Sequence, residues 1–370
     1  MDKTTNQALS TTILANLQWP SPVELLSQLN DVIVFGTGGA AECVTRVLDE
    51  YGVNILYYVD NSLSKQQQDF HGKQVLTPNQ LDKSSATVLI ASYWAKDIAT
   101  QLVQLGVKYL DFSFFVDFQR WKDHFNCQIF DVESAVAVAN KYLTEEDLHS
   151  FLGCIRYRQT YDPLCLTNPS HEHYLSKVVA VEASDIYIDG GAWQGDTVLD
   201  LKALCGNELE IHSFEPDESN CKILKENIAK QELSNCFVVK KALWNQKSTL
   251  QFVTSNEAVH SMQSRVSVTE DSQQVTEVPT TTLDDYCLEL NRHPTYLKLD
   301  IEGAEPQAIE GAKNLLRNHG PKLAISAYHE PNQLWQLIEQ ISEYNPNYKF
   351  WFVHHSQQLF ESVIYAMVKN

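Results

Sequence analysis

The sequence predicts an α/β protein with two doubly wound units, because a buried strand, a glycine turn and a helix follow one another twice. The first such unit begins at 31–41 and the second at 185–204. After each, short apolar runs alternate with segments of helical periodicity, which is typical of a parallel sheet covered by helices on both faces. We therefore expect one small α/β domain at 1–113, a helical connector at 114–180 and a larger α/β domain at 181–370.

The first glycine turn follows the apolar strand Asp31–Phe35 and contains Gly36, Gly38 and Ala41. These three positions fit a relaxed dinucleotide-binding pattern, and Asp60 ends the next strand about 20 residues on, as in Rossmann-like domains. One interpretation is a site for a nucleotide or sugar nucleotide. The other is a Rossmann-like docking domain that keeps the fold without the ligand, and both interpretations stay open.

The segment between the two domains has helical periodicity, strongest over 135–143 and 144–158. The pairs Asp162-Pro163 and Asn168-Pro169 then interrupt the helix. We expect this connector to pack against the second domain.

Composition limits the classes of partner. The formal net charge of the 370 residues is -19, which would repel a phosphate backbone, so no nucleic acid is expected as a partner. The eight cysteines include no Cys-x-x-Cys pair, which argues against a zinc knuckle and fits a reducing compartment. No signal pattern and no run of roughly 18 apolar residues occurs, so we expect a cytoplasmic protein without a membrane span.

The second glycine turn carries acidic residues. It begins at Asp189 and ends at Asp196 and Thr197, whereas a pyrophosphate would need hydrogen-bond donors there. Carboxylates suit a ligand with a cationic amino-acid end, and Glu215, which ends the next strand, can accept hydrogen bonds from both hydroxyls of a ribose. Ribose and an amino-acid cation together indicate S-adenosylmethionine. The residues expected to contact it are Asp189, Gly190, Gly191, Ala192, Trp193, Gly195, Asp196, Thr197, Glu215, Pro216, Ala242 and Asp300.

Candidate catalytic residues follow the later strands of the same domain. Asp300 and Glu302 end the strand that begins at Tyr296, where open α/β sheets bind ligands, and Lys298 shares a strand face with Asp300. His329 follows the next strand and is the first choice for a general base, because an imidazole titrates near neutrality. The alternatives are a buried ion pair for Lys298, a contact of Asp300 with the amine of the cofactor, and a structural role for His329.

A divalent metal on Asp300, Glu302 and His329 is permitted by the residue types. Nothing in their spacing fixes a coordination geometry, so we regard a metal as the less favoured case and assign no metal ligand.

Several segments in a fixed order resemble the FkbM-type S-adenosylmethionine-dependent methyltransferases. The matching segments are 189–197, 214–216, 282–286, 297–305, 324–329, 354–356 and 361–366. The resemblance, together with two closing strands at 348–353 and 362–368, implies the seven-stranded doubly wound sheet of class I methyltransferases. It also implies methyl transfer, usually to an oxygen and often on sugars or other secondary metabolites.

The leading hypothesis is O-methylation of a small hydroxylated acceptor, such as a sugar, a sugar nucleotide or another sugar-containing metabolite. The alternative is a protein that binds or modifies a nucleotide or sugar nucleotide through its N-terminal Rossmann-like domain, and a third is an assembly protein with a degenerate cofactor site. The polar loop His260–Arg265 is a candidate for contact with the acceptor. Neither the acceptor nor the oligomeric state follows from the sequence.

Overall fold

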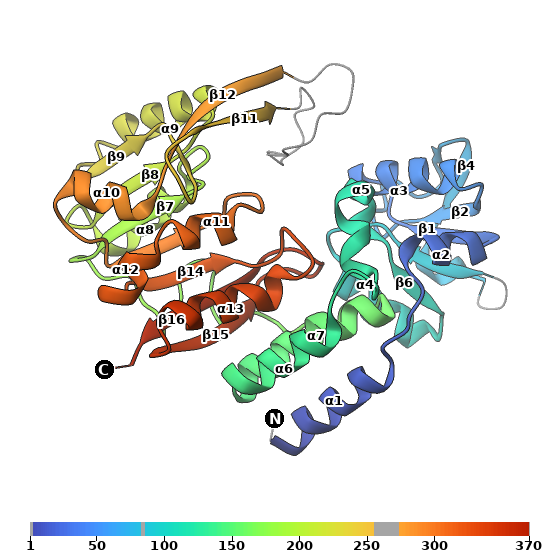
Figure 1. The fold of residues 1–370 in the computed structure, drawn as a ribbon. Coiled ribbons are helices and arrows are strands. Elements are labelled where there is room, and N and C mark those ends of the chain that lie inside the picture. The colour runs from blue at the N-terminus through green and yellow to red at the C-terminus, as the bar shows by residue number, and fades with distance from the viewer. Residues whose placement is uncertain (1–2, 83–85, 255–273, 370) are drawn as a thin grey trace. The chain divides into compact units, whose positions relative to one another are not determined.

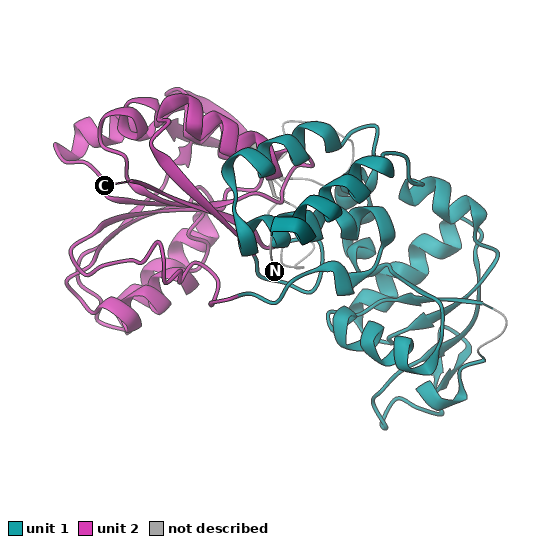
Figure 2. Ribbon diagram, turned by 90° about the horizontal axis from the view of Figure 1, so that it is seen from below, with its two compact units in different colours: residues 1–169, 354–360 teal, residues 170–353, 361–370 magenta. Residues whose placement is uncertain are grey.

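The computed structural model describes residues 3–82, 86–254 and 274–369. The chain forms two compact units (Figure 2), the first made of 1–169 with 354–360 and the second of 170–353 with 361–370. Each unit has its own sheet (Figure 1). The domain boundaries expected near residues 113 and 180 remain predictions.

The first unit contains a six-stranded sheet with the order β3-β4-β2-β1-β5-β6, in which only β3 runs antiparallel to its neighbour. Its strands are β1 (Asp31–Phe35), β2 (Asn54–Val59), β3 (Asp69–Phe70), β4 (Lys73–Leu76), β5 (Thr87–Ile90) and β6 (Tyr109–Asp111). Its α-helices are α1 (Lys3–Ala15), α2 (Pro22–Gln28), α3 (Gly39–Glu50), α4 (Ala95–Leu105), α5 (Phe118–Trp121), α6 (Val132–Tyr142) and α7 (Glu145–Thr160), and its 3-10 turns are η1 (Pro78–Gln80), η2 (Ser113–Asp117), η3 (Lys122–Phe125) and η4 (Pro163–Cys165).

Local sequence explains this sheet. In β1 every residue after Asp31 is buried, as expected for a parallel strand covered on both faces. Ile33 and Ile90 pack in one core cluster with Ile98 and Leu102 of α4. That helix ends where Gly106 adopts φ 70°, a left-handed conformation that favours glycine.

The second unit contains a seven-stranded sheet with the order β15-β16-β14-β13-β7-β8-β9. Its strands are β7 (Ile186–Gly190), β8 (Glu210–Phe214), β9 (Cys236–Val239), β13 (Tyr296–Leu299), β14 (Lys322–Ser326), β15 (Tyr348–His354) and β16 (Ser362–Val368). The five strands from β14 to β9 run parallel, and β16 is antiparallel to β14. This arrangement confirms the predicted class I methyltransferase sheet.

Helices lie on both faces of this sheet (Figure 2). They are α8 (Asp196–Cys205), α9 (Glu218–Lys230), α10 (Leu283–Leu290), α11 (Glu305–Glu310), α12 (Lys313–Asn318) and α13 (Gln333–Tyr344). Leu201 of α8 and Leu224 of α9 belong to the core cluster that contains Tyr187 and Tyr296. The rings of these two tyrosines stack with centroids 4.8 Å apart, which joins β7 to β13.

A separate three-stranded sheet follows β9. It has the order β10-β12-β11 and consists of β10 (Ala242–Leu243), β11 (Thr249–Thr254) and β12 (Gln274–Thr281). The N–H of Lys241 donates to the carbonyl of Val239 (2.9 Å), and this tight turn separates β9 from β10. Ala242 therefore belongs to the second sheet, and β12, whose Pro279 weakens a strand pattern, was not predicted.

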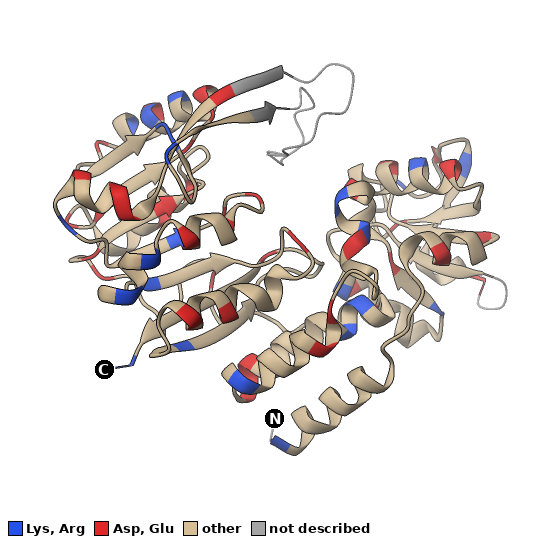
Figure 3. Ribbon diagram, in the orientation of Figure 1, with Lys and Arg blue, Asp and Glu red and all other residues tan. Residues whose placement is uncertain are grey.

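Acidic and basic residues are distributed over the helices and loops of both units (Figure 3). Within the described part of the chain, no helix combines the length and the apolar character that crossing a membrane requires.

Candidate functional site

The acidic residues singled out in the sequence lie at one edge of the seven-stranded sheet. Asp189 is the penultimate residue of β7, Glu215 follows β8 and Asp300 follows β13. These strands are parallel neighbours, so their carboxyl ends meet at the same edge. His329 follows β14, the next parallel strand, and lies beside Asp300.

The glycine turn after β7 is held closely against its neighbours. Gly191 has φ 76°, and a Cβ there would lie 1.9 Å from the carbonyl oxygen of Asp300. Gly195 has φ 93°, and a Cβ there would lie 2.6 Å from a methyl group of Leu224. The N–H groups of Gly191 and Ala192 both donate to the carbonyl of Phe214, at 3.0 and 3.1 Å. These contacts place the turn against the end of β8 and require glycine at both positions.

Glu215 is fully buried, and its two carboxylate oxygens face backbone donors. One accepts the N–H of Trp193 and the other the N–H of Asp217, both at 2.9 Å. Burial raises the pKa of Glu215 to about 7 despite these two hydrogen bonds. Trp193 belongs to the glycine turn and adopts φ 43°. The turn therefore fixes the orientation of Glu215, the carboxylate that the sequence predicts to bind the ribose.

Lys298 holds the same turn from β13. Its ammonium group is 2.9 Å from Oδ1 of Asp189 and donates to the carbonyls of Gly190 (3.2 Å) and Gly191 (2.9 Å). Burial lowers the pKa of Lys298, but Asp189 and Asp300 outweigh burial and raise it above its ordinary value. A lysine that stays charged and donates three hydrogen bonds is a positioning group, which agrees with the ion-pair alternative. The other oxygen of Asp189, Oδ2, is buried without a hydrogen-bond partner among the described residues.

The remaining predicted cofactor residues have mixed exposure. Ala192 and Thr197 are buried, Asp196 is the exposed first residue of α8, and the side chain of Trp193 is 40% exposed. The turn thus presents backbone and the indole of Trp193 rather than a row of charged side chains.

A hollow of about 1020 Å³, open to solvent, lies at this edge of the sheet. Six of the predicted site residues line it: Gly191, Glu215, Pro216, Ala242, Asp300 and Glu302. The hollow also has apolar walls that the sequence did not reveal, made by Phe214, Leu243, Trp244, Leu250 and Val278. An apolar pocket with a buried carboxylate on its wall fits a nucleoside. Glu215 lines the hollow, whereas Asp189 is fully buried behind the glycine turn and is not among the lining residues.

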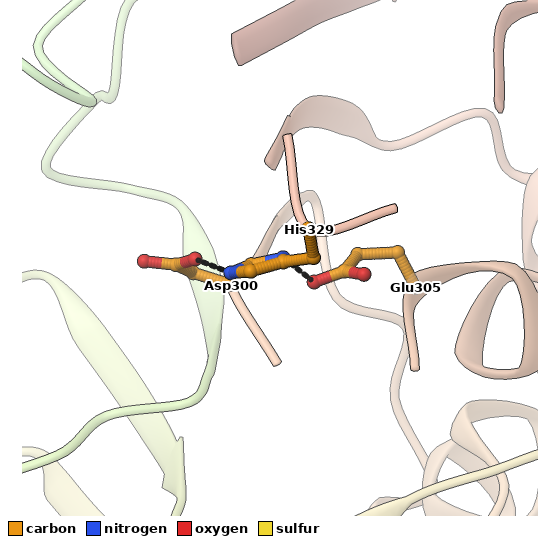
Figure 4. A group of neighbouring side chains, drawn as sticks. All are labelled: Asp300, Glu305 and His329. Carbon is orange, nitrogen blue, oxygen red and sulfur yellow. Dashed lines mark ion pairs between the residues drawn. The ribbon is translucent and has the colours of Figure 1, made fainter. Parts of the chain in front are cut away.

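His329 lies between two carboxylates (Figure 4). Its Nδ1 is 2.9 Å from Oε1 of Glu305 and its Nε2 is 3.4 Å from Oδ1 of Asp300. Its side chain is only 1% exposed. Burial lowers the pKa of His329, but Glu305, Glu302 and Asp300 raise it to about 9. The ring is therefore an imidazolium at neutral pH, which disfavours the predicted role as general base.

Glu305 was not singled out in the sequence. It is fully buried in the first turn of α11, where it accepts the N–H of Ile301 (2.8 Å) and a hydrogen bond from Gln333 (3.1 Å). Its position soon after Asp300 in the segment 297–305 was the available signal. The predicted partner Glu302 is farther from the ring, with its Oε2 3.9 Å from Nε2 of His329.

Asp300, Glu305 and His329 offer three possible metal-ligand atoms within 4.8 Å of one another. The imidazole ring stands between the two carboxylates (Figure 4), and these carboxylates face different ring nitrogens. One ion could not contact both carboxylates and the histidine without rearrangement, so the group is better described as an Asp–His–Glu relay.

In the first unit, the carboxylate of Asp60 forms hydrogen bonds within the chain, one of them to Thr37 of the glycine turn. Oδ2 of Asp60 accepts the hydroxyl of Thr37 at 2.6 Å and lies 3.6 Å from the ammonium group of Lys65, while Oδ1 accepts the N–H of Ser62 at 2.8 Å. Both oxygens of Asp60 therefore accept hydrogen bonds within the chain, as those of Glu215 do, and the nucleotide alternative for this domain stays open. The loop His260–Arg265, the other predicted contact, lies outside the described residues.

Comparison with known proteins agrees with this geometry. Residues 189–352 match the family model of the methyltransferase FkbM domain. The second unit carries an FkbM-type, S-adenosylmethionine-dependent methyltransferase domain. Residues 28–110 match a second model, described as C2185-like, N-terminal. No protein with a curated description matches the chain.

Among solved structures, the methyltransferase FkbM of Methylobacillus flagellatus KT is similar over 98% of both chains, with 17% identity and a TM-score of 0.71. This similarity shows a shared fold across both units of the chain. Aeropyrum pernix fibrillarin with bound S-adenosyl-L-methionine is 12% identical over 51% of this chain and 70% of that chain, with a TM-score of 0.34. An O-methyltransferase from Bacillus cereus is 14% identical over 50% of this chain and 76% of that chain, with a TM-score of 0.32.

Proposed function

We propose that this FkbM-type domain transfers a methyl group to a hydroxyl oxygen of a small acceptor, such as a sugar or a sugar-containing metabolite. The observation that carries the proposal is the buried carboxylate of Glu215 on the wall of the hollow, beside a glycine turn whose Gly191 lines the same hollow.

When bound, S-adenosylmethionine supplies an electrophilic methyl carbon on a sulfonium sulfur. In the proposed complex Glu215 accepts hydrogen bonds from the ribose hydroxyls, and Asp189 with the glycine turn faces the amino-acid end. Pro216, Ala242, Leu243 and Trp244 line the apolar part of the hollow, which suits an adenine.

The acceptor side is assigned to the ends of β13 and β14. Asp300 and Glu302 line the hollow, and their side chains are 24% and 26% exposed, so both can reach a ligand. Carboxylates that are partly exposed at a pocket wall accept hydrogen bonds from hydroxyl groups. This polarity favours a hydroxylated acceptor over an apolar one.

The test has two parts. Calorimetry is expected to show binding of both S-adenosylmethionine and its demethylated product, and absence of binding would refute the cofactor assignment. A methyl-transfer assay over sugars, nucleotide sugars and lipids, with mass detection, is expected to show a product heavier by one methyl group on oxygen. Methylation found only on carbon or nitrogen would refute the proposed O-methylation.

A further inference from the structure

Two chain segments far apart in sequence meet beside Asp300. In the antiparallel ladder of β14 and β16, Ser326 pairs with Val363, and the N–H of Ala327 donates to the carbonyl of Ser362 (2.9 Å). The next positions along this ladder are Tyr328 and Glu361. Because the hydroxyl of Tyr328 donates to Oδ1 of Asp300 (3.3 Å), Glu361 lies at the same edge of the sheet as the proposed acceptor site.

Glu361 is paired with a histidine from the segment that leads into the second unit. Nδ1 of His173 lies 3.2 Å from Oε2 of Glu361. The two side chains are 32% and 33% exposed, whereas the side chain of His329 is 1% exposed. The side chains of His173 and Glu361 are therefore partly accessible from solvent, whereas that of His329 is not.

The pair is held in place by its neighbours. The ring of Tyr174 stacks on His173 with centroids 3.9 Å apart, and its hydroxyl shares a 2.7 Å hydrogen bond with Ser326. The N–H of Tyr174 donates to the hydroxyl of Tyr365 (3.1 Å). Tyr174 and Glu361 adopt φ 58° and 71°, left-handed conformations that are uncommon for residues other than glycine and cluster at functional sites.

The other polar groups at this edge are less suited to removing a proton. Both ring nitrogens of His329 face carboxylates. Asp300 lies near Lys298, His329 and His173, which outweigh its burial and lower its pKa below the ordinary value. A carboxylate held so firmly as an anion has little affinity for a proton.

We propose that Glu361, oriented by His173, accepts the proton of the acceptor hydroxyl during methyl transfer. This assignment rests on the proposed O-methylation. As the acceptor oxygen forms its bond to the methyl carbon, the hydroxyl proton moves to the Glu361 carboxylate, and the electron pair of the breaking carbon–sulfur bond stays on sulfur. The sulfonium charge and the carboxylate charge are both neutralised, so charge balances.

The electrostatic surroundings support this role. Partial burial and the neighbouring Asp300 raise the pKa of Glu361 above its ordinary value, toward neutrality, which suits a general base. Burial lowers the pKa of His173 to about 4 although Asp300 opposes it, so this ring orients Glu361 in its neutral form. The charged or titratable groups that act on Glu361 include Asp300 and Glu302 after β13, Tyr328 and His329 after β14, Lys298 in β13, and His173 and Tyr174 before β7.

The first experiment needs no acceptor. Protons released on cofactor binding are counted at pH 8 by calorimetry in two buffers of different ionisation enthalpy. S-adenosylmethionine carries the sulfonium charge and its demethylated product does not, so the wild type is expected to release more protons with the former. This difference is expected to vanish in Glu361→Gln and to persist in Glu343→Gln, a control at an exposed glutamate of α13. An equal difference in Glu361→Gln, or none in the wild type, would overturn the assignment.

The second experiment uses the acceptor found in the transfer screen. Glu361→Gln is expected to lower kcat by about 100-fold or more, as for loss of a general base, with cofactor affinity changed less than about threefold. His173→Asn is expected to lower kcat less and to shift the acidic limb of its pH profile. An unchanged kcat in Glu361→Gln, or a comparable loss in Glu302→Gln alone, overturns the assignment while leaving the methyl transfer intact. Absence of cofactor binding in the wild type instead refutes the proposed function, and this assignment with it.

Discussion

Glu215 offers the sharpest test of the cofactor site, through the substitution Glu215→Gln. Hydrogen bonds to a charged group contribute about 1.5–3 kcal/mol, so removing the charge that faces the ribose should weaken S-adenosylmethionine binding by about 10- to 100-fold. Titration calorimetry at pH 8 measures this loss. An affinity within twofold of the wild type would refute the role of Glu215.

The same substitution has a consequence for stability without any ligand. Burial raises the pKa of Glu215 from its ordinary 4.5 to about 7, a difference that corresponds to about 3 kcal/mol. Because the folded-state pKa is the higher one, the stabilising contribution is complete below about pH 4.5 and is lost as the pH rises through about 7.

Urea unfolding of the wild type at pH 5 and pH 8 should therefore show a decrease in the free energy of unfolding, of which up to about 3 kcal/mol comes from Glu215. In Glu215→Gln this contribution is absent, so the difference between the two pH values should shrink by that amount. Equal pH dependence in both proteins would contradict the buried environment described for this carboxyl.

Three further perturbations test the packing around the turn. Gly191→Ala places a Cβ 1.9 Å from the carbonyl oxygen of Asp300, so it should lower the thermal midpoint and weaken cofactor binding. Gly206→Ala is the control, because Gly206 has a similar φ of 75° but its Cβ would meet nothing within 4 Å. Equal effects of the two substitutions would contradict the close packing at Gly191. Lys298→Met leaves the buried carboxylate of Asp189 unpaired and should lower the free energy of unfolding, measured in urea, by about 3–5 kcal/mol. A decrease below about 1 kcal/mol would refute the stabilising ion pair. Glu305→Gln removes the carboxylate nearest to His329, so NMR titration should show the imidazole pKa falling from about 9, and an unchanged pKa would exclude the relay.

The general position of the site could be predicted from local sequence patterns. A strand that ends in a glycine turn, and acids that end neighbouring parallel strands, must share one edge of a sheet. Asp189, Glu215 and Asp300 are therefore found together, and Lys298 takes the ion-pair alternative that a buried lysine favours. The presence of seven strands in this sheet likewise follows from the alternation of strands and helices with two closing strands.

Contacts between segments that are distant in the sequence could not be predicted from such local patterns. The pairing of His173 with Glu361 joins the segment before β7 to the start of β16, and only the folded sheet brings them together. The contact of Glu305 with His329 depends on how α11 packs beside β14, and it changes the protonation of the histidine that the sequence had favoured as a base. Leu250 and Val278 line the hollow because the three-stranded sheet places them there, and no motif marks such residues.

The central claim is that the ends of β7, β8 and β13 bind S-adenosylmethionine. A crystal structure of the protein with the demethylated product is the most direct test. It is expected to show the ribose hydroxyls on Glu215, the adenine among Ala242, Leu243 and Trp244, and the amino-acid end at the Asp189 turn. An empty hollow with the ligand at the N-terminal Gly36 turn would contradict the account.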